Sequence, residues 1–390
     1  TEGNPKVIEH LKEENEYAKQ ILKPTEKLQK ALYNEMVGRV YKTQISAPYW
    51  DNGYFYFTRY DEGKDYPTYL RKEDVSKAEE EVILDVNKLA AGHSYFDISN
   101  FLLNISADNN LMAVAFDTVG GWYTLKIKDL STGEWLKDEI PNTTGDHVWA
   151  NDNKTVFYSI PDSAGMSTKV KRHHLGESYL EDTVVFHEKD HQFDLFVFKS
   201  KSKKYIVIRS LSTLTIDNLI LNADDPSGEF KAFQPREEGL EYYIRHFEDK
   251  FYIRTNYNAV NFRVMVTPED KTGKENWKEV IPHRPEVLIY KVEVFKDFLA
   301  IDEMINGLTE IEIINLKNST SNYITFEEEV YSAKVLKRIG YFSTNFNFES
   351  EWLKYDYSSL TTPRCIYEYH MPTGERRTLN QSEILGSYDP

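Results

Sequence analysis

One short pattern recurs seven times along the chain, and this repeat limits the possible folds more than any other feature. Each copy is an apolar segment, a tight polar turn and a second apolar segment. The clearest copy is Ile-Ser-Ala-Asp-Asn-Asn-Leu-Met-Ala-Val-Ala at 105–115. The other copies lie at 50–57, 149–158, 199–208, 247–253, 295–301 and, with a weaker pattern, 336–342. In the first copy Asp51-Asn52-Gly53 provides residues that tolerate the positive φ angles of a tight β-hairpin.

The spacing of the copies is nearly constant. The first apolar residues after each turn are Tyr54, Leu111, Val156, Tyr205, Phe251, Phe298 and Tyr341. Their successive separations are 57, 45, 49, 46, 47 and 43 residues. A period of roughly 40–50 residues built from short strands is typical of a β-propeller, in which each unit is a four-stranded blade. The repeat therefore predicts an all-β, seven-bladed β-propeller over residues 45–380. Another all-β fold with regular turns is the alternative, because the copies share a pattern more than an identity.

Residues 1–44 differ from this pattern and predict an N-terminal α-helical arm. Apolar residues fall at helical spacing among charged ones, and Pro24 divides them into two amphipathic stretches. The side of the propeller or another domain must cover this apolar stripe, and the sequence leaves both open. At the other end, residues 381–390 form a short polar tail, which we expect to be the start of a linker.

Composition excludes several classes of protein. The formal net charge of −16 argues against nucleic-acid binding, which requires clustered Lys and Arg. No apolar run approaches the roughly 18 residues of a membrane span. The single cysteine, Cys365, excludes an internal disulfide and a cysteine-based metal cluster. We expect a cytoplasmic protein; a periplasmic location stays open because the chain starts at Thr1 and no signal peptide is visible.

A search for catalytic motifs predicts no catalytic residue, no metal site and no cofactor. The nearest approach to a serine nucleophile elbow, Gly165-Met166-Ser167, lacks the second glycine and falls in an inter-strand loop. His187 and His191 are four residues apart, but strand-like segments flank them, so the spacing does not place them on one helix face. No phosphate-cradling glycine loop is present.

Asp117 is the one candidate for a substrate-facing residue. It stands at a strand end and is followed by Thr118-Val119-Gly120-Gly121-Trp122, so a carboxylate, two glycines and a tryptophan come together. This combination is suited to the rim of a ligand cavity. An ordinary inter-strand turn is the alternative.

Several collinear segments resemble a known family. They include Tyr54–Tyr60 continuing into Gly63–Pro67, Glu81–Asn87, Asp117–Gly120, Gly228–Arg236, Asn276–His283 and Ser358–Pro363. These segments resemble the N-terminal half of oligopeptidase B (protease II), in the prolyl oligopeptidase family of serine peptidases. The resemblance implies a propeller that covers the active site of an α/β-hydrolase domain and excludes folded proteins. It also implies cleavage of short peptides after Lys or Arg, and N-terminal helices that lie against the hydrolase domain.

No position of this chain matches the catalytic Ser, Asp or His of that family. We therefore expect the chain to be a substrate-gating, size-filtering part with no peptidase activity by itself. Its expected partners are the α/β-hydrolase domain, absent here, and short basic peptides, which an acidic cavity wall would attract. The alternative is a stand-alone propeller that binds peptides or proteins.

Overall fold

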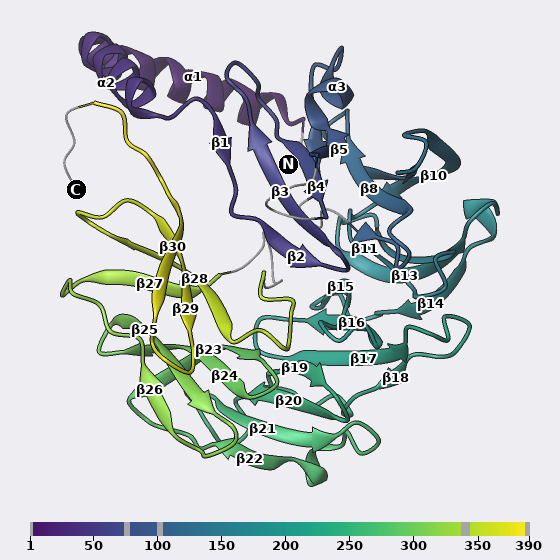
Figure 1. The fold of residues 1–390 in the computed structure, drawn as a ribbon. Coiled ribbons are helices and arrows are strands. Elements are labelled where there is room, and N and C mark those ends of the chain that lie inside the picture. Colours follow the sequence, from purple (N-terminus) through teal and green to yellow (C-terminus); the bar gives the residue numbers. More distant parts are fainter. Residues whose placement is uncertain (1–2, 74–78, 100–103, 337–343, 387–390) are drawn as a thin grey trace.

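The fold is a seven-bladed β-propeller with an N-terminal helical arm, as the repeat predicted (Figure 1). It is seen in a computed structural model that describes residues 3–73, 79–99, 104–336 and 344–386. Within these ranges all strands belong to seven antiparallel sheets, and the sheets follow one another around a central channel. We number them as blades 1 to 7 in chain order.

The helical segments are α1 Pro5–Leu22, η1 Lys23–Thr25, α2 Glu26–Arg39, α3 Val86–Ala90, η2 Tyr179–Glu181 and η3 Lys274–Asn276.

Blade 1 contains β1 Gln44–Ile45, β2 Tyr49–Asp51, β3 Tyr54–Tyr60, β4 Thr68–Lys72 and β5 Glu81–Asp85. Blade 2 contains β6 Asp97–Ile98, β7 Asn104–Ile105, β8 Leu111–Asp117, β9 Tyr123–Asp129 and β10 Trp135–Thr143. Blade 3 contains β11 His147–Trp149, β12 Thr155–Pro161, β13 Ser167–His174 and β14 Thr183–His187. Blade 4 contains β15 Asp194–Lys199, β16 Tyr205–Leu211, β17 Ile216–Asn222 and β18 Lys231–Ala232. Blade 5 contains β19 Tyr242–Phe247, β20 Lys250–Thr255, β21 Arg263–Pro268 and β22 Lys278–Ile281. Blade 6 contains β23 Val287–Val294, β24 Phe298–Ile305, β25 Leu308–Asn315 and β26 Ser321–Tyr323. Blade 7 contains β27 Tyr331–Val335, β28 Trp352–Ser359, β29 Cys365–His370 and β30 Arg376–Gln381.

Each blade starts beside the channel and ends at the periphery (Figure 1). In blades 1 and 2 the innermost position is shared by two short strands, because β1 and β2 both pair with β3, and β6 and β7 both pair with β8. Because each blade has four antiparallel strand positions, the chain leaves a blade at the same face at which it entered. We call this face, where innermost strands begin and outermost strands end, the terminal face, because β1 starts there and β30 ends there.

The repeated turns join the innermost strand of each blade to the second strand. In blade 1 this turn holds Asn52 at φ 48° and Gly53 at φ 89°, the left-handed values that the sequence predicted for it. Corresponding turns of the next four blades hold Asn109, Asn153, Lys203 and Glu248 at positive φ. The weaker seventh copy at 336–342 falls almost entirely outside the described residues. The second strand of that blade, β28, begins only at Trp352.

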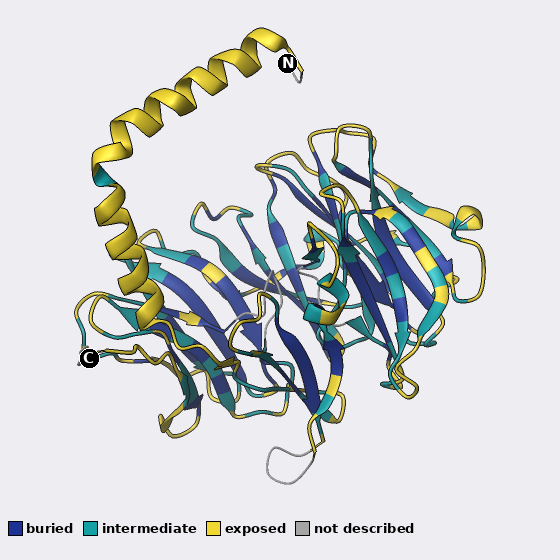
Figure 2. Ribbon diagram, turned by 90° about the horizontal axis from the view of Figure 1, so that it is seen from above, coloured by how far each residue is buried: buried dark blue, intermediate teal, exposed yellow. Residues whose placement is uncertain are grey.

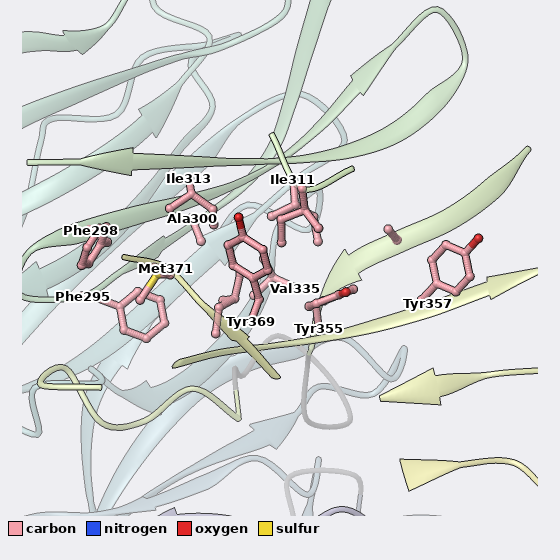
Figure 3. Packing of buried hydrophobic residues seen from close by; sticks show 13 residues of the cluster. Phe295, Phe298, Ala300, Ile311, Ile313, Val335, Tyr355, Tyr357, Tyr369 and Met371 are labelled. Carbon is pink, nitrogen blue, oxygen red and sulfur yellow. The ribbon is translucent and has the colours of Figure 1, made fainter. Parts of the chain in front are cut away.

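Hydrophobic clusters join consecutive blades. Six clusters of buried side chains lie between blades 1 and 2, 2 and 3, and so on to blades 6 and 7. Figure 3 shows the cluster between blades 6 and 7, where Phe295, Phe298 and Ile311 face Tyr355 and Met371. Among the described residues no such cluster joins blade 7 to blade 1. In the described parts of the ring, buried apolar clusters therefore stabilise six of the seven junctions, whereas the junction of blades 7 and 1 has one aromatic contact, between Tyr49 and Phe346 with ring centroids 5.5 Å apart.

Polar contacts connect blade 1 with blade 7. Lys354 Nζ donates to the carbonyl of Pro48 at 2.8 Å, and Asn380 Nδ2 donates to the carbonyl of Ile45 at 2.9 Å. A single antiparallel bridge pairs Val40, after the arm, with Ile384, in the tail. Every blade is nevertheless built from one continuous stretch of chain, so no exchanged strand closes the described ring.

The arm has no buried residue along its length (Figure 2). It begins with Asn4 as N-cap, whose side chain accepts from Lys6 N, and with Pro5 in the first turn, where its missing N–H costs nothing. Its exposed apolar side chains are Val7, Ile8, Leu11, Tyr17, Ile21, Leu22, Leu28, Leu32, Tyr33, Met36 and Val37. The side of the propeller therefore leaves this stripe uncovered. Among the described helices, none is both long and apolar enough to cross a membrane.

Candidate functional site

Asp117 lies at the terminal face, where β8 ends, and its carboxylate organises the turn that follows. Oδ1 accepts from the backbone N–H of Val119 at 2.8 Å and of Gly120 at 3.2 Å, and Oδ2 accepts from Gly121 N at 2.6 Å. The Asp117 side chain is buried, whereas Val119 and Trp122 are exposed on the rim. The geometry thus gives Asp117 a structural task in the turn, and its contact with a substrate stays a prediction.

More carboxylates surround Asp117 at the terminal face. Asp97 starts β6 directly opposite Asp117 in the register, and it accepts from Tyr123 Oη at 2.5 Å. Asp146 and Asp194 lie at the starts of the innermost strands of blades 3 and 4. Burial raises the pKa of Asp146 well above its usual value, and the negative charge of Asp194 raises this pKa further. Carboxylates from three blades therefore lie at this end of the channel, as one pair in blade 2 and a second pair between blades 3 and 4.

A second acidic site on this face is Glu328, in the connection between blades 6 and 7. Its carboxylate accepts from Ser359 Oγ at 2.5 Å and from Thr362 Oγ1 at 3.1 Å, and also from the hydroxyls of Tyr357 and Thr361. Hydrogen bonds from Ser359, Thr361 and Tyr357 lower the pKa of Glu328 to about 2. The carboxylate therefore stays ionised at any physiological pH.

The interior of the channel has the opposite character. A cavity of about 200 Å³ is lined mainly by the innermost strands β2, β7, β11, β15 and β19 of blades 1 to 5, and also by Glu293 of blade 6 and by Phe346. Its cationic lining residues are Lys199, Lys201, Lys203, Arg209 and Arg245, whereas its carboxylates are Asp51 and Glu293. Carboxylates therefore gather at the terminal face, whereas cations predominate in the lining of the cavity.

Aromatic rings hold two of the arginines of blades 4 and 5 in place. The Arg209 guanidinium lies 5.0 Å from the ring centroids of both Phe198 and Tyr243. The Arg254 guanidinium lies 4.8 Å from Tyr243 on one side and 3.6 Å from Phe262 on the other. Guanidinium and aromatic groups thus alternate across these blades, an arrangement that cation–π attraction stabilises.

The other residues considered in the sequence analysis lie at strand ends or take part in structural contacts. His187 ends β14, and the exposed His191 lies 3.2 Å from Asp162 through Nδ1 and Oδ2. Among the described residues no group of three or more His, Cys, Asp or Glu has the arrangement of a metal site. Ser167 starts β13 and donates its backbone N–H to Asp194 Oδ1 at 2.8 Å. Cys365 is buried in β29 and donates through Sγ to the carbonyl of Pro363 at 3.2 Å.

Sequence reasoning missed the cations of the channel. Lys199, Lys201 and Lys203 alternate in the fourth copy of the repeat, and this alternation is the one signal that was available. Arg245 stands between apolar and aromatic residues in an ordinary strand pattern, and nothing local marks it as a channel residue.

These features define a propeller domain with an acidic face, at which both ends of the ring emerge, and a basic interior. The family described as "Prolyl oligopeptidase, N-terminal beta-propeller domain" matches residues 2–382, and the chain belongs to this family.

Known relatives match the chain almost completely. It is 34% identical to dipeptidyl aminopeptidase BI of Pseudoxanthomonas mexicana, covering 99% of this chain and 54% of the relative. It is 32% identical to protease 2 of Moraxella lacunata, covering 99% of this chain and 55% of the relative. Among solved structures, oligopeptidase B from Leishmania major superposes with a TM-score of 0.89 at 26% identity, over 99% of this chain and 55% of the other. The chain thus spans about half the length of the relatives it matches.

Proposed function

We propose that this chain is the substrate-gating propeller of an oligopeptidase B-like serine peptidase that cleaves short peptides after Lys or Arg. The observation that carries the proposal is the convergence of both ends of the ring on the terminal face, together with relatives nearly twice as long as this chain. An α/β-hydrolase domain connected beyond the tail would meet the propeller at this face. It would supply the Ser, Asp and His that this chain does not match.

The uncovered arm supports such a partner domain. Its apolar side chains are exposed along both helices, from Val7 to Val37. A continuous exposed apolar surface usually marks an interaction site. The hydrolase domain is the partner that the family membership favours.

The charge of the terminal face supports a preference for basic peptides. Asp97 and Asp194 start innermost strands at the end of the channel that would face the hydrolase domain, and the ionised Glu328 lies on the same face, whereas Asp117 and Asp146 are buried. A mouth lined by one sign of charge raises the local concentration of oppositely charged ligands. Peptides that carry Lys or Arg would therefore be enriched beside the active site, while the rigid ring would exclude folded proteins by size.

The direct test compares the 390-residue chain with the complete protein. The chain alone is expected to leave reporter peptides ending in Arg or Lys intact. The complete protein is expected to cleave them, to be blocked by a serine-directed reagent, and to spare a folded protein that carries the same residues. Hydrolysis by the highly purified chain alone, sensitive to the same reagent, would refute the proposal.

A stand-alone binding module is the second candidate, because the ring has its own channel and six hydrophobic clusters without a partner domain. The exposed arm argues against it. The stand-alone binding module would be favoured if the native protein ended near residue 390, bound peptides stably and showed no hydrolase activity in its host.

A further inference from the structure

We propose that the propeller channel binds a peptide carboxylate and that Arg245 is its principal donor. The assignment of a peptide as the ligand depends on the proposed function. The anion site itself depends only on the geometry of the channel.

Arg245 is a half-buried cation that makes no ion pair among the described residues, although the negative charge of Glu293 acts on it. It lies in β19, the innermost strand of blade 5, and lines the channel. Within the part of the chain that the structure describes, its one hydrogen bond runs from Nη1 to the carbonyl of the preceding residue, Ile244, at 3.0 Å. A guanidinium carries five N–H donors in a planar fork that matches a carboxylate. Most of these donors are therefore available to a ligand in the cavity.

The neighbouring cations leave an excess of positive charge around Arg245. Lys201 pairs with Glu293 at 2.9 Å and Lys203 pairs with Asp51 at 2.6 Å. Asp51 and Glu293 are the two carboxylates that line the cavity, and Glu293 is shared, because it also lies 3.4 Å from Lys291 and acts on Arg245. Lys199 donates instead to the neutral amide oxygen of Asn151 at 2.8 Å. A ligand anion would supply the missing negative charge.

The electrostatic state of the lysines agrees with this excess. Burial, together with the positive charge of the nearby Lys203, lowers the pKa of Lys199 to about 8. Burial also lowers the pKa of Lys201, to which Lys291 and Arg245 contribute as like charges, although Glu293 opposes them. An anion bound among these groups would relieve their mutual repulsion.

The size of the cavity limits what part of a ligand fits. At about 200 Å³ it is smaller than the ~300–1,000 Å³ of typical small-molecule sites. The aromatic rings of Phe196, Phe198 and Tyr243 form part of its wall. A single terminal residue with its carboxylate suits this space, whereas a whole peptide does not.

The order of charges along the channel is complementary to the order of charges along a basic peptide. Carboxylates gather at the terminal face, whereas Lys199 to Lys203 lie where β15 ends, toward the opposite face. A peptide with a Lys or Arg side chain near the terminal face would point its C-terminal carboxylate into the basic interior. The same interior would accept the carboxylate of an acidic side chain, so the two sources need separate probes.

The test measures peptide binding to the 390-residue chain by calorimetry and needs no catalysis. The probes are a short N-acetylated peptide with a free C-terminal carboxylate, the same peptide as its C-terminal amide, and the amide with one internal Glu. We expect the free acid to bind and the amide to bind at least about tenfold more weakly, since hydrogen bonds to charged groups contribute that much. Rescue of binding by the internal Glu would assign the site to acidic side chains as well as to C-termini.

The variant that tests the donor is Arg245→Gln, and its matched control is Arg39→Gln on the exposed arm. Arg245→Gln is expected to bind the free acid at least about tenfold more weakly, while Arg39→Gln binds it like the unchanged chain. If Arg245→Gln fails to fold, the comparison of free acid with amide on the unchanged chain still decides.

Three results would overturn the proposal. The first is equal binding of acid and amide, the second is unchanged binding by a folded Arg245→Gln, and the third is no binding of the free acid. Binding of inorganic phosphate without any binding of the peptides would establish a small-anion site and refute the peptide ligand. Because the complete protein is not involved, a failure of this site and a failure of the proposed peptidase function are distinguished.

Discussion

At the scale of single residues, buried ionisable groups join neighbouring blades by hydrogen bonds as well as by apolar contact. His173, in β13, is buried and lies between two carboxylates: Nδ1 is 2.9 Å from Asp182 Oδ1 and Nε2 is 3.1 Å from Asp138 Oδ1. Burial lowers the pKa of His173, but the hydrogen bonds and charges of Asp182 and Asp138 outweigh it and raise the pKa above 6.5. His173 thus connects blade 3 with β10 of blade 2.

The raised pKa of His173 predicts a loss of stability on the alkaline side. A histidine whose pKa is higher in the folded state stabilises the fold fully below the unfolded pKa of about 6.5, and this stabilisation disappears as the pH rises through the folded pKa. We expect His173→Gln to lower the free energy of unfolding by about 1–3 kcal/mol at pH 6 and by less at pH 9. Denaturant titrations across this range measure the effect. The control is His174→Gln in the exposed neighbour, for which a smaller loss of stability at pH 6 is expected than for the buried His173.

Two substitutions of Asp117 in the complete protein distinguish its role in the turn from the effect of its charge. Asp117→Ala removes all three turn hydrogen bonds and the charge, whereas Asp117→Asn keeps an acceptor for Val119 and Gly120 and removes the charge. If the carboxylate attracts basic peptides, both variants are expected to raise KM several-fold for Arg and Lys reporters. An unchanged rate and affinity in Asp117→Ala would remove Asp117 from the substrate-facing surface. A defect in Asp117→Ala alone would assign it to the turn.

At the scale of elements, the arm and the blades are stabilised differently. Each blade buries apolar side chains against the next, while α1 and α2 bury none. Apart from the hydrogen bond from Leu385 N to the carbonyl of Arg39 at the end of α2, local hydrogen bonds and capping hold the described arm, so its stability is marginal. Burial of the apolar side chains of the arm against the proposed hydrolase domain would increase the stability of the arm.

We therefore predict that an apolar-to-charged substitution in the arm affects the complete protein but not the 390-residue chain alone. Leu32→Glu is expected to leave the stability of the 390-residue chain within about 0.5 kcal/mol, because the side chain is exposed. In the complete protein the same change would place a charge in an apolar contact and release the arm to limited proteolysis. Lys30→Glu, on the same helix, is the control. Equal protease resistance of the Leu32→Glu and unchanged complete proteins would contradict burial of the arm.

At the scale of the whole molecule, the junction of blades 7 and 1 differs from the other six. Polar contacts such as Lys354 with Pro48 connect the two blades, and described hydrophobic clusters occupy the other junctions. A ring with one weaker junction can part there at lower cost than elsewhere. Parting of these blades is one route by which a peptide would reach the channel.

A disulfide across this junction tests its contribution. Val40 and Ile384 are partners in an antiparallel bridge, whose Cα separation of about 4.5–5.5 Å suits a disulfide. We expect oxidised Val40→Cys/Ile384→Cys to unfold with a free energy about 2–4 kcal/mol higher than the reduced form. The buried Cys365 is not expected to compete. If peptides pass between blades 7 and 1, the oxidised complete protein would also lose activity and regain it on reduction; unchanged activity would exclude this route.

The sequence determined by itself those features that depend on local chemistry. The blade count followed from turns that need a positive φ, such as Asn52-Gly53, and from alternation on either side of them, because both act within about ten residues. The arm and the short helix α3, with Asp85 as its N-cap, were predictable for the same reason.

Only the tertiary structure decided which charges meet. Asp97 and Asp117 become neighbours through the pairing of β6 with β8 in blade 2, and the charge of Asp194 in blade 4 raises the pKa of Asp146 beside blade 3, so these contacts depend on strand pairing and on blade stacking. Arg245 has the local pattern of any strand residue, and it becomes a channel residue because β19 takes the innermost position of its blade. The repeat specifies the strands, but closure of the ring determines which side chains share the channel, because that proximity arises between blades and not within them.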